Sequence, residues 1–167
     1  MNLIHRSLAL IAISLLAVSG LFSQWQAQSG GTSQVLLGVS FPAPDTGCIV
    51  GTAGTILVTK NGGTSWTSIT SGTTKFLRDV SFPWVHSGVV VGESGLIMVS
   101  TNGGANWTAK TSGTTEHLVH VHMKSSMLGM ASGQHGVILK TTDAGFTWQV
   151  QSSGVTVELP GIFVTGD

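Results

Sequence analysis

The sequence predicts an all-β protein made of β-propeller-type repeats, each a blade of four antiparallel strands. Trp66, Trp107 and Trp148 are each separated by 41 residues, and each ends a motif of the same form. A period of about 20 to 50 residues indicates one supersecondary unit stacked on copies of itself. The 167 residues also include 23 glycines and only 8% charged residues, which suits short strands joined by tight turns.

The second unit, residues 76–108, shows most clearly how four strands fit into one repeat. Its first segment alternates, so Val80 and Phe82 share one face while Asp79 and Ser81 share the other. Its second segment is almost continuously apolar, which is typical of a strand covered on both faces. About 40 residues in four antiparallel strands is the size of a propeller blade. The expected strands are Leu77 to Phe82, Gly88 to Gly92, Leu96 to Ser100, and a fourth that starts at Trp107.

The repeated motif, Ser/Thr-x-Asp/Asn-x-Gly-x-x-Trp, has the chemistry of a stapled hairpin. The Asx side chain can accept hydrogen bonds from backbone N–H groups of its own turn. The glycine permits a positive φ angle, and the tryptophan buries a large aromatic area between blades. These expected structural residues are Thr59, Asn61, Gly63, Trp66, Ser100, Asn102, Gly104, Trp107, Thr141, Asp143, Gly145 and Trp148.

The number of units is an anomaly. Whole units are expected at residues 34–67, 76–108 and 117–149, flanked by an orphan outer strand at Trp25 and an orphan inner strand at Leu159 to Thr165. Propellers usually need four to eight blades to close, so these three form an incomplete propeller. We favour a fragment of a larger propeller. The alternative is an open array whose exposed blade faces are covered by another chain or by self-association.

The motif resembles the BNR or Asp-box repeat of sialidase-type propellers. The Ser-Gly-Thr-Thr linkers at residues 71–74 and 112–115, and the Gly-x-Val-Val-Gly and Gly-x-Ile-Leu patterns, are similar to the photosystem II stability/assembly factor-like family. This resemblance covers about residues 25 to 167 and implies a protein-binding or assembly scaffold without catalytic activity. Two departures are Asn in the first two boxes and Ala144, where the other boxes have a second glycine.

A glycoside hydrolase is the alternative function. The resemblance to sialidases would imply a tyrosine nucleophile and an arginine cluster, but the chain has no tyrosine, and its arginines are Arg6 and Arg78. We therefore expect that the chain is not an enzyme. The alternative stays open as a fragment of a sialidase-like hydrolase whose catalytic residues lie in missing blades.

No cofactor and no metal site is expected. His120 and His122 are two residues apart on an expected strand and could share a face, but their repeat counterparts are Asp79 and Ser81, and no third ligand is evident. The single cysteine, Cys48, has Val89 and Met130 as counterparts and is expected to be a small buried core residue.

Protein partners are the expected ligands. Seven basic residues balance seven acidic ones, so the chain has no net field to attract nucleic acid. In a propeller the turns between the second and third strands and the linkers between blades share one face, and loops on a rigid scaffold commonly carry recognition. The expected partner-binding face comprises Lys75, Phe76, Glu93, Ser94, Glu116, His117, Gln134 and His135.

Residues 1–23 have the layout of a secretory signal peptide. Arg6 precedes an apolar run from Leu8 to Leu16, and small residues follow near Val18 to Ser23. An uncleaved anchor is the alternative, but the apolar stretch is shorter than the ~20 residues that span a bilayer. We therefore expect an exported protein, secreted or periplasmic, without a membrane span after cleavage, in which residues 24–167 form the propeller repeats.

Overall fold

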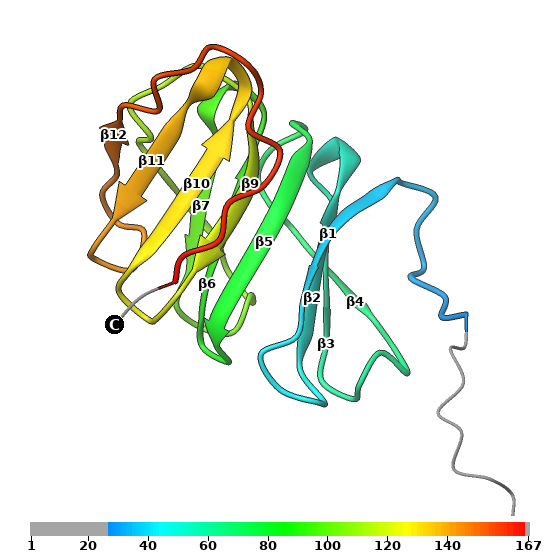
Figure 1. The fold of residues 1–167 in the computed structure, drawn as a ribbon. Coiled ribbons are helices and arrows are strands. Elements are labelled where there is room, and N and C mark those ends of the chain that lie inside the picture. The colour runs from blue at the N-terminus through cyan, green and yellow to red at the C-terminus, as the bar shows by residue number, and fades with distance from the viewer. Residues whose placement is uncertain (1–26, 166–167) are drawn as a thin grey trace, which may run out of the picture.

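The computed structural model describes residues 27–165, which form three four-stranded antiparallel sheets (Figure 1). The fold is therefore all-β, as predicted. The strands are β1 (Leu36–Ser40), β2 (Gly47–Gly51), β3 (Ile56–Thr59) and β4 (Thr67–Ile69) in the first blade; β5 (Leu77–Trp84), β6 (Ser87–Gly92), β7 (Ile97–Ser100) and β8 (Thr108–Lys110) in the second; and β9 (Leu118–Met123), β10 (Gly129–Gly133), β11 (Ile138–Thr141) and β12 (Gln149–Gln151) in the third.

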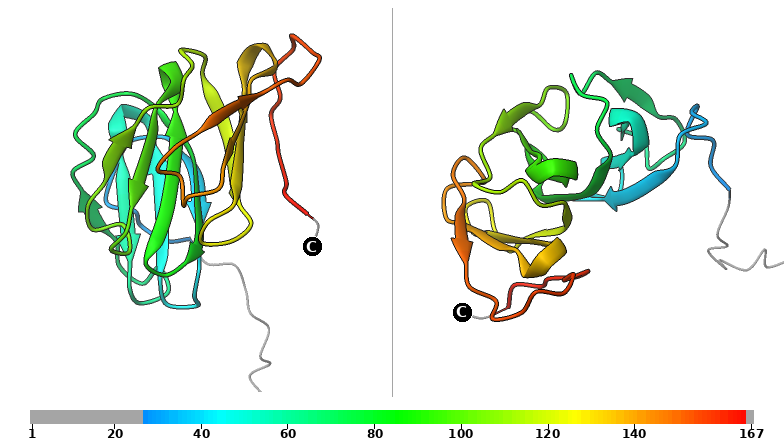
Figure 2. Two further views of the ribbon diagram at one scale, coloured as in Figure 1. Left: turned by 90° about the vertical axis from the view of Figure 1, so that its left-hand side faces the viewer. Right: turned by 90° about the horizontal axis from the view of Figure 1, so that it is seen from above.

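Each blade is a simple meander in which consecutive strands pair, so the strand order in each sheet equals the chain order. A one-turn 3-10 helix joins the second and third strands of each blade: η1 (Thr52–Gly54), η2 (Glu93–Gly95) and η3 (Gln134–Gly136). Seen from above, the three blades stand in an arc with their sheets face to face (Figure 2). The first strands of the second and third blades lie against the blade before them, β5 against β1 and β2, and β9 against β5 and β6.

Two hydrophobic clusters hold the blades together, one in each joint between neighbouring sheets. The first joint packs Cys48, Val50, Ile56 and Val58 of the first blade against Leu77, Val80, Phe82, Val90 and Met98 of the second. The second joint packs Val89, Val91, Ile97 and Val99 of the second blade against Leu118, Val121, Met123, Ala131, Leu139 and Trp148 of the third. Because β6 and β7 are apolar on both faces, the sheet of the second blade can serve both joints.

Hydrogen bonds from backbone N–H groups to side chains also cross the joints. Ser40 Oγ accepts the Phe82 N–H at 3.0 Å, and Ser81 Oγ accepts the Met123 N–H at the same distance. Asp79 Oδ2 accepts the Val121 N–H at 2.9 Å in the second joint. The polar faces of β1 and β5, of which the second was recognised in the alternation of residues 77–82, therefore bond to the next blade.

The end of the described chain differs from the strand expected at Leu159 to Thr165. These residues run along the third blade but form no strand (Figure 1). The Leu159 N–H donates to the Gly133 carbonyl at 2.9 Å, and Ser132 Oγ donates to the Leu159 carbonyl. A strand needs a ladder with a second strand, and no further strand stands beside this segment in the described chain.

Three expectations concern other boundaries. The fourth strands begin one residue after the motif tryptophans, at Thr67, Thr108 and Gln149. The orphan strand at Trp25 and the signal peptide at residues 1–23 lie outside the described residues. Between residues 27 and 165, no helix has the length and apolar character needed to cross a bilayer.

Candidate partner-binding face

The three Asp boxes close their hairpins with the same bonds. In the third, Asp143 Oδ1 accepts the Thr147 N–H at 2.9 Å, and Thr141 Oγ1 accepts the Gly145 N–H. Hydrogen bonds from Thr147 hold the pKa of the Asp143 carboxyl below its usual value. Asn61 and Asn102 accept the equivalent N–H groups of Ser65 and Asn106 in the other boxes. An amide thus replaces the carboxylate because only one acceptor oxygen is needed.

The box glycines have the left-handed backbone that the motif requires. Gly63, Gly104 and Gly145 have φ of 88°, 83° and 84°. Ala144 has φ of 64° and therefore keeps the left-handed backbone although it carries a Cβ. The Trp107 and Trp148 indole N–H groups donate to the Gly104 and Gly145 carbonyls of their own turns, and both rings contact the cluster of the joint behind them.

The opposite end of the blades carries the predicted partner-binding face. Here each linker between blades is tied to the 3-10 turn of the blade it leaves. The Gly54 N–H donates to the Lys75 carbonyl at 2.9 Å, and the Gly95 N–H donates to the Glu116 carbonyl at 2.8 Å. A Cβ at Gly95 would collide with the Thr114 carbonyl, so the turn and linker backbones approach as closely as glycine permits.

Six of the eight predicted face residues are joined in three pairs. Glu93 Oε2 accepts the Phe76 N–H at 3.1 Å, the Ser94 N–H donates to His117 Nδ1 at 2.9 Å, and Glu116 Oε2 lies 2.6 Å from His135 Nδ1. The seventh is Gln134, whose amide donates to Glu158 at 3.3 Å and whose N–H donates to the His117 carbonyl. Lys75 joins through its backbone, since its carbonyl accepts the Gly54 N–H and its N–H donates to Thr73 Oγ1, and the side chains of Lys75 and Phe76 are both exposed.

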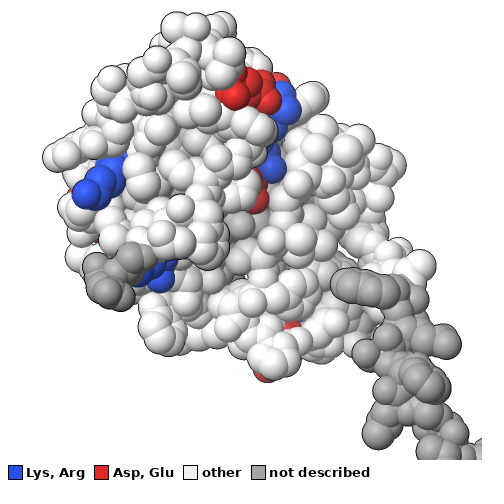
Figure 3. Space-filling model, viewed as in Figure 1, with Lys and Arg blue, Asp and Glu red and all other residues white. Residues whose placement is uncertain are grey.

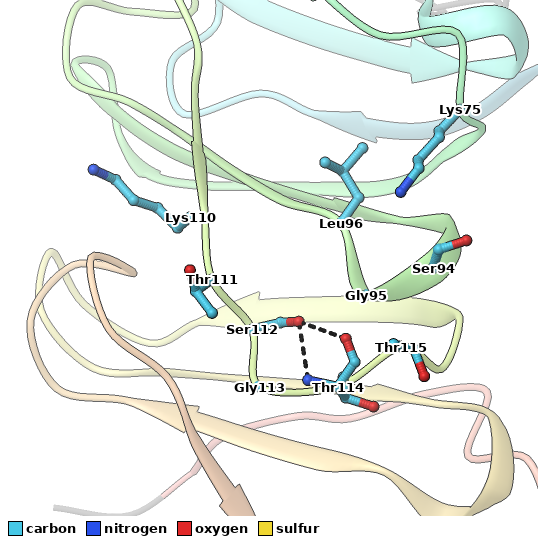
Figure 4. A pocket seen from close by; sticks show the side chains of 10 residues that line it. All are labelled: Lys75, Ser94, Gly95, Leu96, Lys110, Thr111, Ser112, Gly113, Thr114 and Thr115. Carbon is cyan, nitrogen blue, oxygen red and sulfur yellow. Dashed lines mark hydrogen bonds between the residues drawn. The ribbon is translucent and has the colours of Figure 1, made fainter.

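Shallow grooves run beside these linkers. One, of about 670 Å³, lies between Lys75 and Lys110 and is floored by Ser112, Gly113 and Thr114 (Figure 4). Ser112 Oγ accepts the Thr114 N–H and donates to its carbonyl, which closes the linker on itself. A second groove of about 690 Å³ lies one blade earlier. Since the grooves repeat with the linker, they are a property of the blade and not a site unique to one joint.

At the other end of the blades, a hollow of about 810 Å³ lies between the first two Asp-box hairpins. Lys60, Asn61, His86 and Asn102 are among the residues that line it. It lies away from the predicted face, because β5 starts at the linker end and finishes at the hairpin beside His86.

The charges on the molecule are few. On the side seen in Figure 3, acidic and basic groups lie next to one another near the upper right, and most of the remaining surface is uncharged. Arg78 Nη2 lies 3.9 Å from Glu93 Oε1, so its charge is partly balanced. Burial raises the pKa of the Asp79 carboxyl, against the opposing effect of the hydrogen bond from Val121 and of the nearby His120.

Neither histidine of the β9 pair is arranged with the ligand set that a metal would need. His120 Nε2 lies 3.6 Å from Asp79 Oδ2, and His122 stacks on Phe163 with the ring centroids 4.2 Å apart. Residues 27–165 contain no group of three His, Cys, Asp or Glu side chains placed to hold a metal ion. Cys48 is buried in the first joint, and burial raises the pKa of its thiol to about 12, so the thiolate is not formed at neutral pH.

The sequence does not reveal the bridging role of Ser40, Ser81 and His122. Each accepts the backbone N–H of the residue 42 positions later, namely Phe82, Met123 and Val164. A signal was present, because all three positions carry hydrogen-bond acceptors. Serine and histidine look unrelated in a repeat alignment, however, and the donor is a backbone group that no sequence pattern shows.

Comparisons with solved structures agree with this architecture. YCF48 bound to a D1 peptide is 24% identical, with a TM-score of 0.67 over 74% of this chain and 43% of that chain. YCF48 from Cyanidioschyzon merolae is 25% identical, with a TM-score of 0.63 over 71% of this chain and 40% of that chain. This chain therefore spans less than half the length of either.

An ancestral GH74 enzyme is 18% identical, with a TM-score of 0.60 over 72% of this chain and 19% of that chain, which shows a shared fold alone. No curated protein matches the sequence. The family model described as photosynthesis system II assembly factor YCF48 matches residues 64–163, and these include every strand of the second and third blades. The chain therefore belongs to the family of the photosynthesis system II assembly factor YCF48.

Proposed function

We propose that this chain is an exported, non-catalytic scaffold that binds a segment of another protein on the face formed by the linkers and 3-10 turns. The observation that carries the proposal is the pairing of the turn and linker residues from three blades. Contacts within that face fix its backbone while Phe76 and Lys75 stay exposed. An exposed aromatic ring and an exposed cation on a rigid surface are suitable anchors for a peptide.

Family membership supports the same kind of partner. The solved YCF48 structure that resembles this chain is described as bound to a D1 peptide. A peptide segment of this kind would meet the rigid face as an extended chain. Backbone ordering would then cost the face little free energy, because its turns are already tied to the linkers.

The carboxylates support a role without catalysis. Asp79, Glu93, Asp143 and Glu158 all accept hydrogen bonds from neighbouring groups, and Glu116 lies against His135. Glycoside hydrolysis commonly needs two carboxyl groups facing one another across an open site. The carboxylates of the face are instead engaged in holding turns and linkers.

Export rests on the layout of residues 1–23. Expression of the full chain in a bacterium, followed by mass spectrometry of the exported form, should give an N-terminus between about residues 18 and 24. Recovery only of the intact chain from the cytoplasm would contradict export.

Calorimetric titration with a synthetic D1 peptide tests the binding face. We expect saturable binding that Phe76→Ala weakens about tenfold, or ~1.4 kcal/mol. Trp84→Ala is the matched control, because Trp84 is an exposed aromatic at the far end of β5, the strand that starts directly after Phe76. No binding, or equal weakening by both substitutions, would contradict this assignment of the face.

A further inference from the structure

The segment after the third blade, residues 159–165, is fastened by a bond that differs in kind from the equivalent serine bonds in the two joints. The Val164 N–H donates to His122 Nδ1 at 3.0 Å. The same position in the preceding blades is Ser81 and Ser40, whose hydroxyls accept the equivalent N–H groups. A hydroxyl accepts a hydrogen bond at every pH at which proteins fold, whereas an imidazole nitrogen accepts only while it is unprotonated.

The donor fixes the state of the ring. A backbone N–H can only donate, so Nδ1 of His122 must hold a lone pair and the proton of the neutral ring must be on Nε2. The ring also stacks on Phe163 at 4.2 Å between centroids, with an interplanar angle of 31°. Both contacts of His122 therefore attach the same segment to the third blade.

The ionisable groups around His122 come from two strands. His120 lies on its own strand, β9, and Asp79 lies on β5 of the preceding blade; both influence its titration. The residue opposite His122 on β10 is Met130, and residues 159–165 include no ionisable side chain. Glu158, just before the segment, is bonded to Gln134. Burial and the neighbouring His120 lower the pKa of His122, with Asp79 opposing them.

We propose that His122 is a pH-sensitive latch whose protonation releases residues 159–165 from the third blade. Protonation puts a hydrogen on Nδ1, which turns the acceptor into a second donor facing the Val164 N–H. The other end of the segment, held by Gly133 and Ser132 through backbone and hydroxyl groups, has no ionisable partner. Release would therefore start near Phe163 and uncover the face of the third blade that points away from the second blade.

The sign follows from the lowered pKa. The latched state favours neutral His122, so its contribution to stability is complete above the usual histidine pKa of about 6.5. That contribution is lost as the pH falls from there through the lowered pKa of the folded protein. The bond from Val121 to Asp79 should persist through this range, because a carboxyl group accepts a hydrogen bond in either protonation state.

Nuclear magnetic resonance of the full chain between about pH 8 and pH 5 tests the latch. We expect the protection of the Val164 amide against hydrogen exchange, corrected for the intrinsic rate, to fall at least about tenfold along the titration of the His122 ring. The Met123 amide, bonded to Ser81, is the internal control and should keep its protection.

His122→Ser is the matched variant, because serine is the residue that the other two blades use at this position. It should keep Val164 protected and remove the pH dependence. A Val164 amide whose protection is constant in the wild-type chain, or falls equally in His122→Ser, would overturn the proposal. The wild-type titration alone decides the question if the variant does not fold.

Discussion

The first and second blades have nearly the same residues on the face that looks back along the array, yet one face is open and the other is covered. The covered face of the second blade lies in the first joint, where the first blade packs against it. The exposed fractions are 41%, 60% and 47% for Leu36, Val39 and Phe41, against 0%, 4% and 8% for their counterparts Leu77, Val80 and Phe82. Burial here depends on the neighbouring blade and not on the residue.

This difference shows that the free energy of folding is concentrated in the joints. Fully burying one large aliphatic or aromatic side chain contributes about 1.5–3 kcal/mol, and the first blade forgoes much of this on its back face. Stability in such arrays is close to a sum of repeat and nearest-neighbour terms. The face of the third blade that points away from the second blade is more polar, because it has Ser132 and Lys140 where the first blade has Val50 and Val58.

The largest effect is expected from removing a covered side chain. Leu77→Ala should lower the free energy of unfolding by about 2–5 kcal/mol, because it leaves a cavity in the first joint. Leu36→Ala, at the open counterpart, should cost about 1 kcal/mol or less. Urea denaturation followed by tryptophan fluorescence measures both. Equal losses would show that the back face of the first blade is covered in solution.

An intermediate effect is expected at the box glycines. The same substitution can be made at Gly104, which faces a preceding blade, and at Gly63, which does not. Gly104→Ala would place a Cβ 3.1 Å from Val58 of the preceding blade, whereas at Gly63 the nearest atom is 3.5 Å away, on its own Trp66. Both variants carry the left-handed penalty of about 1–2 kcal/mol. Gly104→Ala should cost about 1 kcal/mol more.

Thermal unfolding of the two glycine variants, compared with the wild-type chain, gives this difference. An equal cost for Gly63→Ala and Gly104→Ala would mean that the box turn does not press on the preceding blade.

The smallest effect is expected at Asp79 in the second joint, whose counterpart in the first joint is Gly38. Burial raises the pKa of Asp79, so the group favours folding below its usual pKa and this contribution is lost as the pH rises through the raised value. Asp79→Asn keeps an acceptor for the Val121 N–H without the charge. Relative to this variant, the wild-type chain should lose stability between about pH 4 and pH 7.

Urea denaturation of both proteins across that range measures the slope. A wild-type chain that gains stability relative to Asp79→Asn as the pH rises would show that His120, 3.6 Å away, outweighs the burial of Asp79.

The blade architecture could be predicted from the sequence because its causes are local and repeated. The tryptophan spacing sets the unit, the glycines fix the turns, and the alternation at Val80 and Phe82 gives the covered face. Short-range patterns of this kind can be recognised directly in the amino-acid sequence.

The contacts between blades were harder to predict. Asp79, Ser81 and His122 bind backbone N–H groups about 42 residues away, and the chemistry of those donors is the same for every sequence. The pairing of Ser94 with His117 and of Glu116 with His135 is hidden for a related reason. It depends on how far each blade turns relative to the last, which no residue spacing specifies.

The middle residue of each 3-10 turn has a use beyond this molecule. Ala53, Ser94 and His135 share a left-handed backbone, with φ of 52°, 53° and 52°, although none of them is glycine. The same turn conformation thus accepts the side chains of alanine, serine and histidine without a change of backbone shape. Chemists who want to graft new functional groups at regular intervals along a stiff protein edge could therefore vary these three sites independently.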